Sequence, residues 1–374
     1  MFPMSPQIRL HLPHQPGIYR MRHVNGDLLY IGKAKSLKQR VNSYFRRNVS
    51  HPEHILEMLT QARDLDFSLT QSALEAAILE SDEIKHHSPL YNRALHRHQR
   101  NLVFCTKDLR QHSILCDHQF SLGPLPGGKL IDAMAAFGKW LTNGMRLSGD
   151  DHDGIGYTLL ALPRAYAPEI QCLREGFDFF RRNHRYRLEN QSPLRVLTAL
   201  GAKFWREHRQ TLTPADADRE VNTDNNNADA QQHEKSVNAH GWTPDDVAGV
   251  IESILMQSAH LIRRARWFCL LSESALAWAS ADNPDRCKNL IVFERGLIRD
   301  RYDLNLAKNL PVPPGFARSF HARQKYFDLI TYDRLRVLTT ELRRIISEGR
   351  RIELRLSPTV RLKRHALKRA LQWV

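Results

Sequence analysis

The chain has few cysteines and no long apolar run, and both absences exclude classes of protein. Its five cysteines among 374 residues are scattered, and no two of them have Cys-x-x-Cys spacing, so neither a disulfide framework nor a zinc cluster is indicated. No apolar run approaches the roughly 18 residues that a membrane-spanning helix needs, and residues 1–16 contain no apolar signal-peptide core. We therefore expect a cytoplasmic protein in a reducing environment.

Acidic residues are too few to balance the basic ones. The chain has 55 Lys and Arg against 40 Asp and Glu, a formal net charge of +15, and a pI near 9.8. Hydrophobic residues make up 42% of the chain, which is enough to build packed cores and excludes wholesale disorder. The positive excess favours a polyanionic partner over a small neutral substrate.

One segment, residues 213–246, is poor in aliphatic residues. It carries eight acidic and two basic side chains, a net charge of −6, and this composition predicts an acidic flexible linker. We expect it to separate residues 101–212, an α+β extension, from a basic C-terminal α+β region at 247–374. Both flanking regions read as mostly helical. The first also has β-like runs at 102–106 and 114–122, and the second has a small β element around 267–278 and 289–302 with a turn at Arg295-Gly296.

The first hundred residues predict a separate small α+β domain. Two β-prone runs, 17–21 and 28–31, flank the hairpin signal Asn25-Gly26-Asp27. Residues 65–70 alternate like a third strand. Helices are predicted over 37–47, over 55–62, and from a capping-box pattern at 72–75 to about residue 87. The resulting order, ββααβα, predicts a three-stranded antiparallel sheet with flanking helices.

Basic side chains gather just after the predicted hairpin. Between residues 27 and 53 there are six Lys or Arg and no acid. Such a run is usually a solvated face, but here tyrosines accompany it at positions that bring them to the same patch. Phenols, an ammonium and a guanidinium around one patch form a set that handles phosphate. The members of this set are Tyr19, Tyr30, Lys33, Arg40 and Tyr44.

The same residues resemble the GIY-YIG nuclease superfamily. Its two triplets are present as Gly17-Ile18-Tyr19 and Tyr30-Ile31-Gly32, and the wider text PGIYRM…LLYIGKAKSLKQRVNSYF is similar to the N-terminal incision domain of UvrC and of its shorter relative Cho. The stretches EAAILESDEIKHHSPLYNRAL and FSLGPLPGGKLIDAMAAFGKWL support the resemblance. Six positions are in register with the family pattern: Tyr19, Tyr30, Lys33, Arg40, Glu80 and Asn92.

The resemblance implies hydrolysis of a phosphodiester with one divalent metal, Mg²⁺ or Mn²⁺, held by Glu80 together with waters and phosphate oxygens. It implies Tyr30 as general base, with its phenolate favoured by Lys33 and metal-bound water, and Arg40 as the ligand of the scissile phosphate. Tyr19 is expected to pack beside the phosphate, and Asn92 to donate to it or to orient water. Further substrate contacts are expected from Tyr44, Lys35, Lys38 and Arg46. Without the motif, Glu80 would be an exposed helix glutamate, the tyrosines core residues, and Asn92 a turn residue.

The resemblance also implies a biological role. It predicts an endonuclease that makes a single-strand incision in damaged duplex DNA during nucleotide excision repair, on the 3′ side of the lesion, with a UvrB–DNA complex as partner and no membrane. The family's cysteine cluster is reduced here to Cys172, so no iron–sulfur cluster is expected. Two alternatives stay open: a sequence-specific or mobile-element GIY-YIG endonuclease, and a catalytically dead DNA-binding module.

The C-terminal end is rich in cations. Residues 343–369 contain ten Lys or Arg and two Glu. Spaced cations neutralise phosphates without reading sequence, so we expect this run to contact DNA, with an ordinary basic helix as the alternative.

Overall fold

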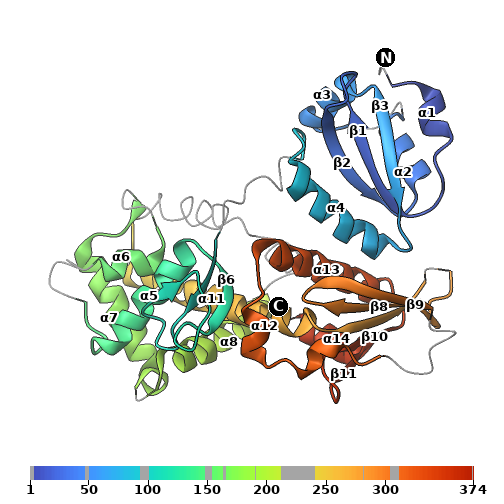
Figure 1. Cartoon of the computed structure of the whole chain (residues 1–374). Coiled ribbons are helices and arrows are strands. Elements are labelled where there is room, and N and C mark those ends of the chain that lie inside the picture. The colour runs from blue at the N-terminus through green and yellow to red at the C-terminus, as the bar shows by residue number, and fades with distance from the viewer. Residues whose placement is uncertain are drawn as a thin grey trace. The chain divides into compact units, whose positions relative to one another are not determined.

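The computed structural model describes residues 4–46, 50–92, 101–147, 154–162, 166–189, 191–211, 241–280, 282–303, 311–372 and 374 (Figure 1). The chain forms two compact units, each assembled from separated stretches. The first unit comprises Met1–Gln99, Leu271–Phe316 and Asp328–Lys368, and the second comprises Arg100–Leu270, Ala317–Phe327 and Arg369–Val374. The four-region partition read from the sequence stays a prediction, and most of its acidic segment, 213–240, lies outside the described residues. No helix in the described ranges is long and apolar enough to cross a membrane.

The N-terminal part of the first unit is the predicted small α+β domain. Its sheet has the order β2-β1-β3, and β1 pairs antiparallel with both neighbours. A short helix that the sequence did not predict, α1, precedes the sheet, and Gly26 turns the hairpin with a φ of +90°. The elements are α1 (Pro6–Leu10), β1 (Gly17–Arg22), β2 (Leu28–Ala34), α2 (Leu37–Ser43), α3 (Glu53–Gln61), β3 (Asp64–Leu69) and α4 (Ala73–His87).

Local capping explains where the helices begin. The Ser36 hydroxyl accepts from the Gln39 N–H at the start of α2, and the Ser72 hydroxyl accepts from the Glu75 N–H at the start of α4. The predicted helix starts at 37 and 73 are therefore confirmed. Helix α2 ends at Ser43, earlier than predicted, and its C-cap Tyr44 is only 4% exposed because it packs into the core.

Helices cover both faces of this sheet. Adjacent residues of β1 point to opposite faces, so Ile18 packs with Ala76 and Ile84 of α4, whereas Tyr19 packs with α2 and α3. Arg20 then ties α4 to the sheet: its Nε lies 2.6 Å from Glu83, and its Nη1 lies 2.7 Å from Asp66 of β3. The domain is therefore a three-layer arrangement with a well-fixed α4.

The C-terminal part of the same unit is a second α+β element. Its five-stranded antiparallel sheet has the order β11-β10-β7-β8-β9. The predicted turn at Arg295-Gly296 joins β8 to β9, with both residues at positive φ. A long helix, α13, packs against α4 (Figure 1). The elements are β7 (Ala275–Ala279), β8 (Cys287–Glu294), β9 (Leu297–Asp303), α13 (Leu329–Ser347), β10 (Ile352–Arg355), β11 (Arg361–Lys363) and α14 (Arg364–Leu371).

The second unit is mostly helical around Trp140, whose ring contacts Phe177 and Phe180. Two sequence expectations fail here. Residues 114–121 are not a strand, and residues 267–271 continue a helix instead of entering the sheet. The principal elements are β4 (Leu102–Cys105), β5 (His112–Ser113), β6 (Leu122–Pro126), α5 (Lys129–Thr142), α6 (Ile155–Leu160), α7 (Ile170–Leu188), α8 (Pro193–Thr211), α11 (Pro244–Leu271) and α12 (Phe320–Gln324). The predicted fold class, an α+β domain followed by a mostly helical region with a β element, is confirmed.

Candidate active site

A hollow of about 580 Å³ in the first unit collects most of the predicted site residues. Its walls come from the end of β2, from α2, from α4 and from α13. Seven of the ten residues singled out from the sequence line it: Tyr19, Tyr30, Lys33, Lys35, Arg40, Arg46 and Glu80. The other three, Lys38, Tyr44 and Asn92, are not among its lining residues.

Glu80 is fixed in this hollow by a single neighbouring residue. Its Oε1 accepts the backbone N–H of Lys33 at 2.9 Å, and its Oε2 lies 3.3 Å from the Lys33 ammonium. The side chain is 17% exposed, so Glu80 is not the solvated helix glutamate of the alternative interpretation. Burial raises the pKa of Glu80 above its ordinary value, although the charge and hydrogen bonds of Lys33 oppose this.

Tyr19 and Tyr30 line the hollow, and Tyr44 packs against Tyr19 from outside it. The Tyr19 and Tyr44 hydroxyl oxygens are 2.7 Å apart, and the Tyr19 ring centroid lies 6.2 Å from that of Tyr30. The Arg40 guanidinium carbon sits 5.0 Å from the centre of the Tyr44 ring, a cation–π arrangement. Tyr44 therefore contributes from behind the pocket, through Tyr19 and Arg40, and not as a direct wall residue.

Tyr30 is held in its neutral form by the protein's own groups. Burial raises its pKa well above the ordinary value, and the neighbouring Tyr44 and Glu80 raise it further, while Arg40 acts in the opposite direction. The expectation that Lys33 and metal-bound water favour the phenolate stays a prediction. A role for Tyr30 as base stays a prediction, and it requires positive charge supplied at Glu80.

The glycine of each triplet is required by close packing. A Cβ at Gly32 would overlap the Tyr19 hydroxyl and lie 2.9 Å from the Tyr30 ring. A Cβ at Gly17 would overlap the Ser68 carbonyl oxygen of β3. These glycines let the tyrosines and strands approach one another, and the approach shapes the pocket.

Asn92 lies behind β2 and not in the hollow. Its Oδ1 accepts the Ile31 N–H at 2.9 Å, and its Nδ2 donates to the Ile31 carbonyl at 2.8 Å. The side chain is 8% exposed. Asn92 therefore pins the strand that carries Tyr30 and Lys33, and its contact with phosphate or water stays a prediction.

Sequence reasoning missed the wall supplied by α13. Glu341 and Arg344 line the hollow, and Glu348 of the same unit pairs with Lys35, whose Nζ lies 2.8 Å from Glu348 Oε1. The Lys35 ammonium, predicted to bind substrate, is thus already paired with a carboxylate. Positions 341, 344 and 348 fall on one helical face, but the sequence does not show that this face meets residue 35.

Other parts of the described chain offer weaker sites. No group of three or more His, Cys, Asp or Glu there could hold a metal ion.

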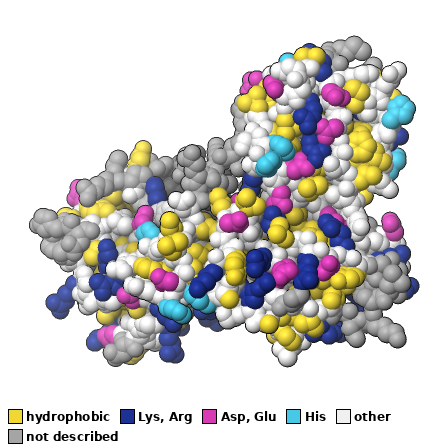
Figure 2. Space-filling view, in the orientation of Figure 1, with side chains coloured by type: hydrophobic (Ala, Val, Ile, Leu, Met, Phe, Trp, Pro, Cys, Tyr) yellow, Lys and Arg dark blue, Asp and Glu magenta, His cyan; other side chains and the backbone are white. Residues whose placement is uncertain are grey.

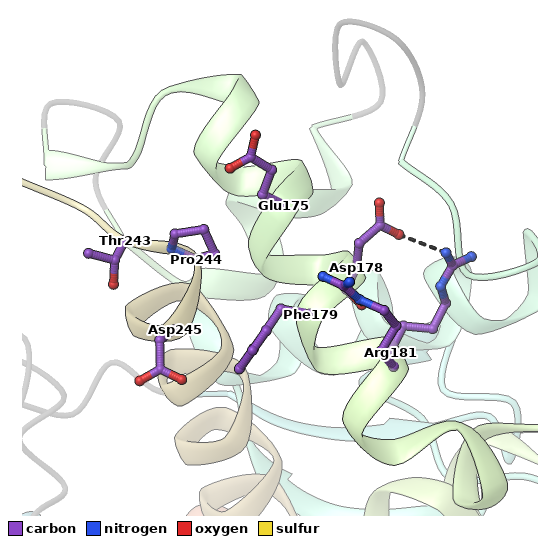
Figure 3. Close-up of a pocket in the computed structure, with 8 residues that line it drawn as sticks. Glu175, Asp178, Phe179, Arg181, Thr243, Pro244 and Asp245 are labelled. Atoms are coloured by element: carbon purple, nitrogen blue, oxygen red, sulfur yellow. Dashed lines mark hydrogen bonds and ion pairs between the residues drawn. The ribbon is translucent and has the colours of Figure 1, made fainter.

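On the face shown in Figure 2, the coloured Lys and Arg side chains lie among Asp and Glu and do not form one continuous stripe. Figure 3 shows a hollow between α7 and the start of α11. Its Arg181 is paired with Asp178 at 2.9 Å, and it contains none of the predicted site residues.

Comparison with known proteins agrees with this geometry. The profile of the UvrC-like GIY-YIG domain matches residues 15–93. Residues 15–93 form a UvrC-like GIY-YIG domain. The UvrABC system protein C of Psychrobacter sp. (strain PRwf-1) is 48% identical over 81 residues, which are 22% of this chain and 13% of that protein. That of Idiomarina loihiensis is 37% identical over 128 residues, 32% of this chain and 21% of that protein.

A solved structure is similar to the same part of the chain. The GIY-YIG N-terminal endonuclease domain of UvrC from Thermotoga maritima, bound to its catalytic magnesium, is 34% identical, with a TM-score of 0.22. The match covers 24% of this chain and 99% of the Thermotoga maritima domain. This chain covers only about a fifth or less of the length of these curated relatives.

Proposed function

We propose that this chain is a divalent-metal-dependent DNA endonuclease that makes a single-strand incision in nucleotide excision repair, on the 3′ side of the lesion. The observation that carries the proposal is one pocket in which the Glu80 carboxylate, held by Lys33, faces the same hollow as Tyr30 and Arg40. The repair role is supported by the name UvrABC system protein C that the curated relatives bear. Its substrate would be damaged duplex DNA, its partner a UvrB–DNA complex, and its location the cytoplasm.

The donor set of the hollow fits a magnesium ion. Two glutamates line the hollow: Glu341 pairs with Arg344, whereas Glu80 is held by Lys33. Ligation by Glu80 alone suits Mg²⁺, which keeps most of its waters, with Mn²⁺ as a substitute. Burial raises the pKa of Glu80, and a cation beside it would favour its charged form. When bound, the metal would supply electrostatic stabilisation of the charge that develops on the phosphate.

The position of each remaining site residue suggests its role. Arg40, whose guanidinium rests against Tyr44, would bind the scissile phosphate. With positive charge supplied at Glu80, Tyr30 would release its own proton to solvent and, as the phenolate, would hold the attacking water and take its proton at Oη. Lys33 keeps Glu80 oriented and adds positive charge beside it. Asn92 would act through Ile31, by holding β2 in place.

The test is incision of a duplex with one site-specific lesion, with Mg²⁺ and purified UvrA and UvrB, labelled at either end to map the cut. We expect Glu80→Gln to lower the incision rate at least about a hundredfold. Glu57→Gln, an exposed glutamate on α3, is the matched control and should incise normally.

Three outcomes would contradict the proposal. Full incision by Glu80→Gln would overturn the mechanism. Cutting of undamaged DNA at a fixed sequence without partners would assign the chain to the restriction or mobile-element class. Binding without cleavage under every metal would make it a DNA-binding module.

A further inference from the structure

The face of α4 opposite Glu80 is charged and is covered by another part of the chain. At about 100° per residue, positions 75, 82 and 85 cluster on the side of the helix away from position 80. A lone helix would leave such side chains in water. Here Glu75 is 7% exposed and Lys85 is 15% exposed in their side chains, so this face is an interface within the first unit.

Each of these three charges has a partner in the C-terminal α+β element. Lys85 Nζ lies 2.6 Å from Asp333 Oδ2, and Arg334 Nη2 lies 3.0 Å from Asp82 Oδ2. Arg301 of β9 reaches Glu75, with Nε 2.6 Å from Oε2. The signs are complementary across the interface: α4 presents acid, acid and base, and the C-terminal element presents base, base and acid.

The partners on α13 are themselves buried. Asp333 and Arg334 are 7% and 8% exposed in their side chains. Arg334 Nε also donates to both Asp82 oxygens, at 3.2 and 3.1 Å, and its Nη1 donates to the Gly296 carbonyl at 3.5 Å. Arg334 therefore bridges α4 to the β8–β9 turn.

Buried ion pairs contribute more to register than to net stability. The desolvation of two charges offsets most of their attraction, but a buried charge that loses its partner is strongly unfavourable. Three ion pairs along α4, two of one polarity and one of the other, therefore disfavour a rotation or a slide of the helix. A movement of α4 would displace Glu80, and a displacement of about 1 Å at a catalytic group can lower the reaction rate about a hundredfold.

We infer that Asp333 and Arg334 of α13 are positioning residues for Glu80, acting through Lys85 and Asp82 to fix the rotation and axial position of α4. The metal site of the UvrC-like domain is then completed by the C-terminal element, more than 240 residues away in the sequence. The inference rests on the proposed function only in taking Glu80 as the metal ligand.

The test measures metal binding directly. Mn²⁺ is titrated into the full chain without DNA, and free Mn²⁺ is followed by electron paramagnetic resonance. We expect Arg334→Gln to raise the Mn²⁺ dissociation constant about fivefold or more, and to raise the Mg²⁺ needed for half-maximal incision by a similar factor, with the KM for DNA unchanged. Arg334→Lys, which keeps the charge, should restore most of the binding.

Two controls separate positioning from general damage. Arg299→Gln removes a cation of β9 that pairs with Glu294 and Asp300 and should leave Mn²⁺ binding unchanged. The melting temperature and circular dichroism of every variant establish that it is folded. If Arg334→Gln fails to fold, the exchanged pair Lys85→Asp with Asp333→Lys serves instead: each single change should weaken Mn²⁺ binding, and the double change should recover it.

The outcomes distinguish this inference from the proposed function. A folded Arg334→Gln that binds Mn²⁺ like the wild type overturns the inference, as does a loss of incision that saturating Mg²⁺ leaves unrepaired. Absence of Glu80-dependent Mn²⁺ binding in the wild type overturns it too. Wild-type chain that binds Mn²⁺ through Glu80 and Arg334 but never cuts DNA would refute the proposed function and leave the inference standing.

Discussion

The hydroxyl groups of Tyr19 and Tyr44 hydrogen-bond to each other, 2.7 Å apart, in a core where neither residue is more than 4% exposed. Each buried hydroxyl group thus has the other as its hydrogen-bond partner. Burial raises the pKa of Tyr19 well above its ordinary value, and Tyr44 adds to this, so Tyr19 stays neutral. The pair also supports Arg40, whose guanidinium rests on the Tyr44 ring.

The tyrosine pair should show thermodynamic coupling. Tyr19→Phe and Tyr44→Phe each leave one buried hydroxyl unsatisfied, at a cost of about 1–3 kcal/mol in the free energy of unfolding. The double variant removes both hydroxyls and should be less destabilised than the sum of the two single variants. Urea unfolding of the three variants measures this, and strict additivity would argue against the pairing.

Gly32 should tolerate no side chain. Gly32→Ala places a methyl group against the Tyr19 hydroxyl and the Tyr30 ring, and overpacking of this kind costs about 1–3 kcal/mol. Displacement of both tyrosines should also reduce incision at least about tenfold. The control is Gly26→Asn at the hairpin turn, where no atom lies within 4 Å of a new Cβ and Asn accepts positive φ. Normal incision by Gly32→Ala would contradict the tight packing.

Asn92 should act on strand position and not on substrate binding. Asn92→Ala leaves the Ile31 N–H and carbonyl without their buried partner, so we expect a loss of about 1–3 kcal/mol in the free energy of unfolding. Incision should fall through kcat, while the KM for DNA changes little. A large rise in KM with unchanged stability would instead indicate direct contact with substrate.

Glu348 should restrain DNA binding through Lys35. Burial alone would raise the pKa of Glu348, but hydrogen bonds from Lys35, Arg350 and Arg344 lower it to about 2. A carboxyl group with a lowered pKa stabilises the fold above its ordinary pKa of about 4.3, and this contribution is lost as the pH falls toward 2. The pair is therefore intact at neutral pH.

Glu348→Gln frees the Lys35 ammonium and should tighten DNA binding up to about fivefold at low salt, since exposed pairs are worth about 0–1 kcal/mol. The gain should be the same at about pH 5 and pH 8, because Glu348 is ionised at both. Fluorescence anisotropy measures it, with Glu353→Gln as the control in the same element. A gain that appears at only one of these pH values would contradict the assignment.

The sequence predicted the UvrC-like domain well because its signals are local. Hairpin turn, capping boxes and strand alternation fall within a few residues of each element, and the family pattern named the residues that meet in the pocket. The sequence could not reveal that Asn92 binds the Ile31 backbone, because an asparagine in a motif does not show which group its side-chain amide will bind. The wall from α13 was equally invisible, because it depends on contacts between residues far apart in the chain.

The basic C-terminal run illustrates the same limit. Its cations were expected to meet DNA, yet the fold uses many of them internally. Arg344 and Arg350 pair with Glu348, and Arg364 donates to the Ile346 carbonyl. Arg355 is buried. The net charge includes these arginines, but they already have partners within the protein. The number of cations that can bind a polyanion is therefore smaller than the composition suggests.

The pairing of α4 with α13 also sets an order of events during synthesis. The UvrC-like domain leaves the ribosome first, whereas α13 follows about 250 residues later, some tens of seconds at typical translation rates of roughly 5–20 residues per second. During that interval the charged face of α4 has only water as a partner. A chain that has not yet reached α13 would thus have a complete sheet, but its α4 would lack the ion pairs that we infer position Glu80.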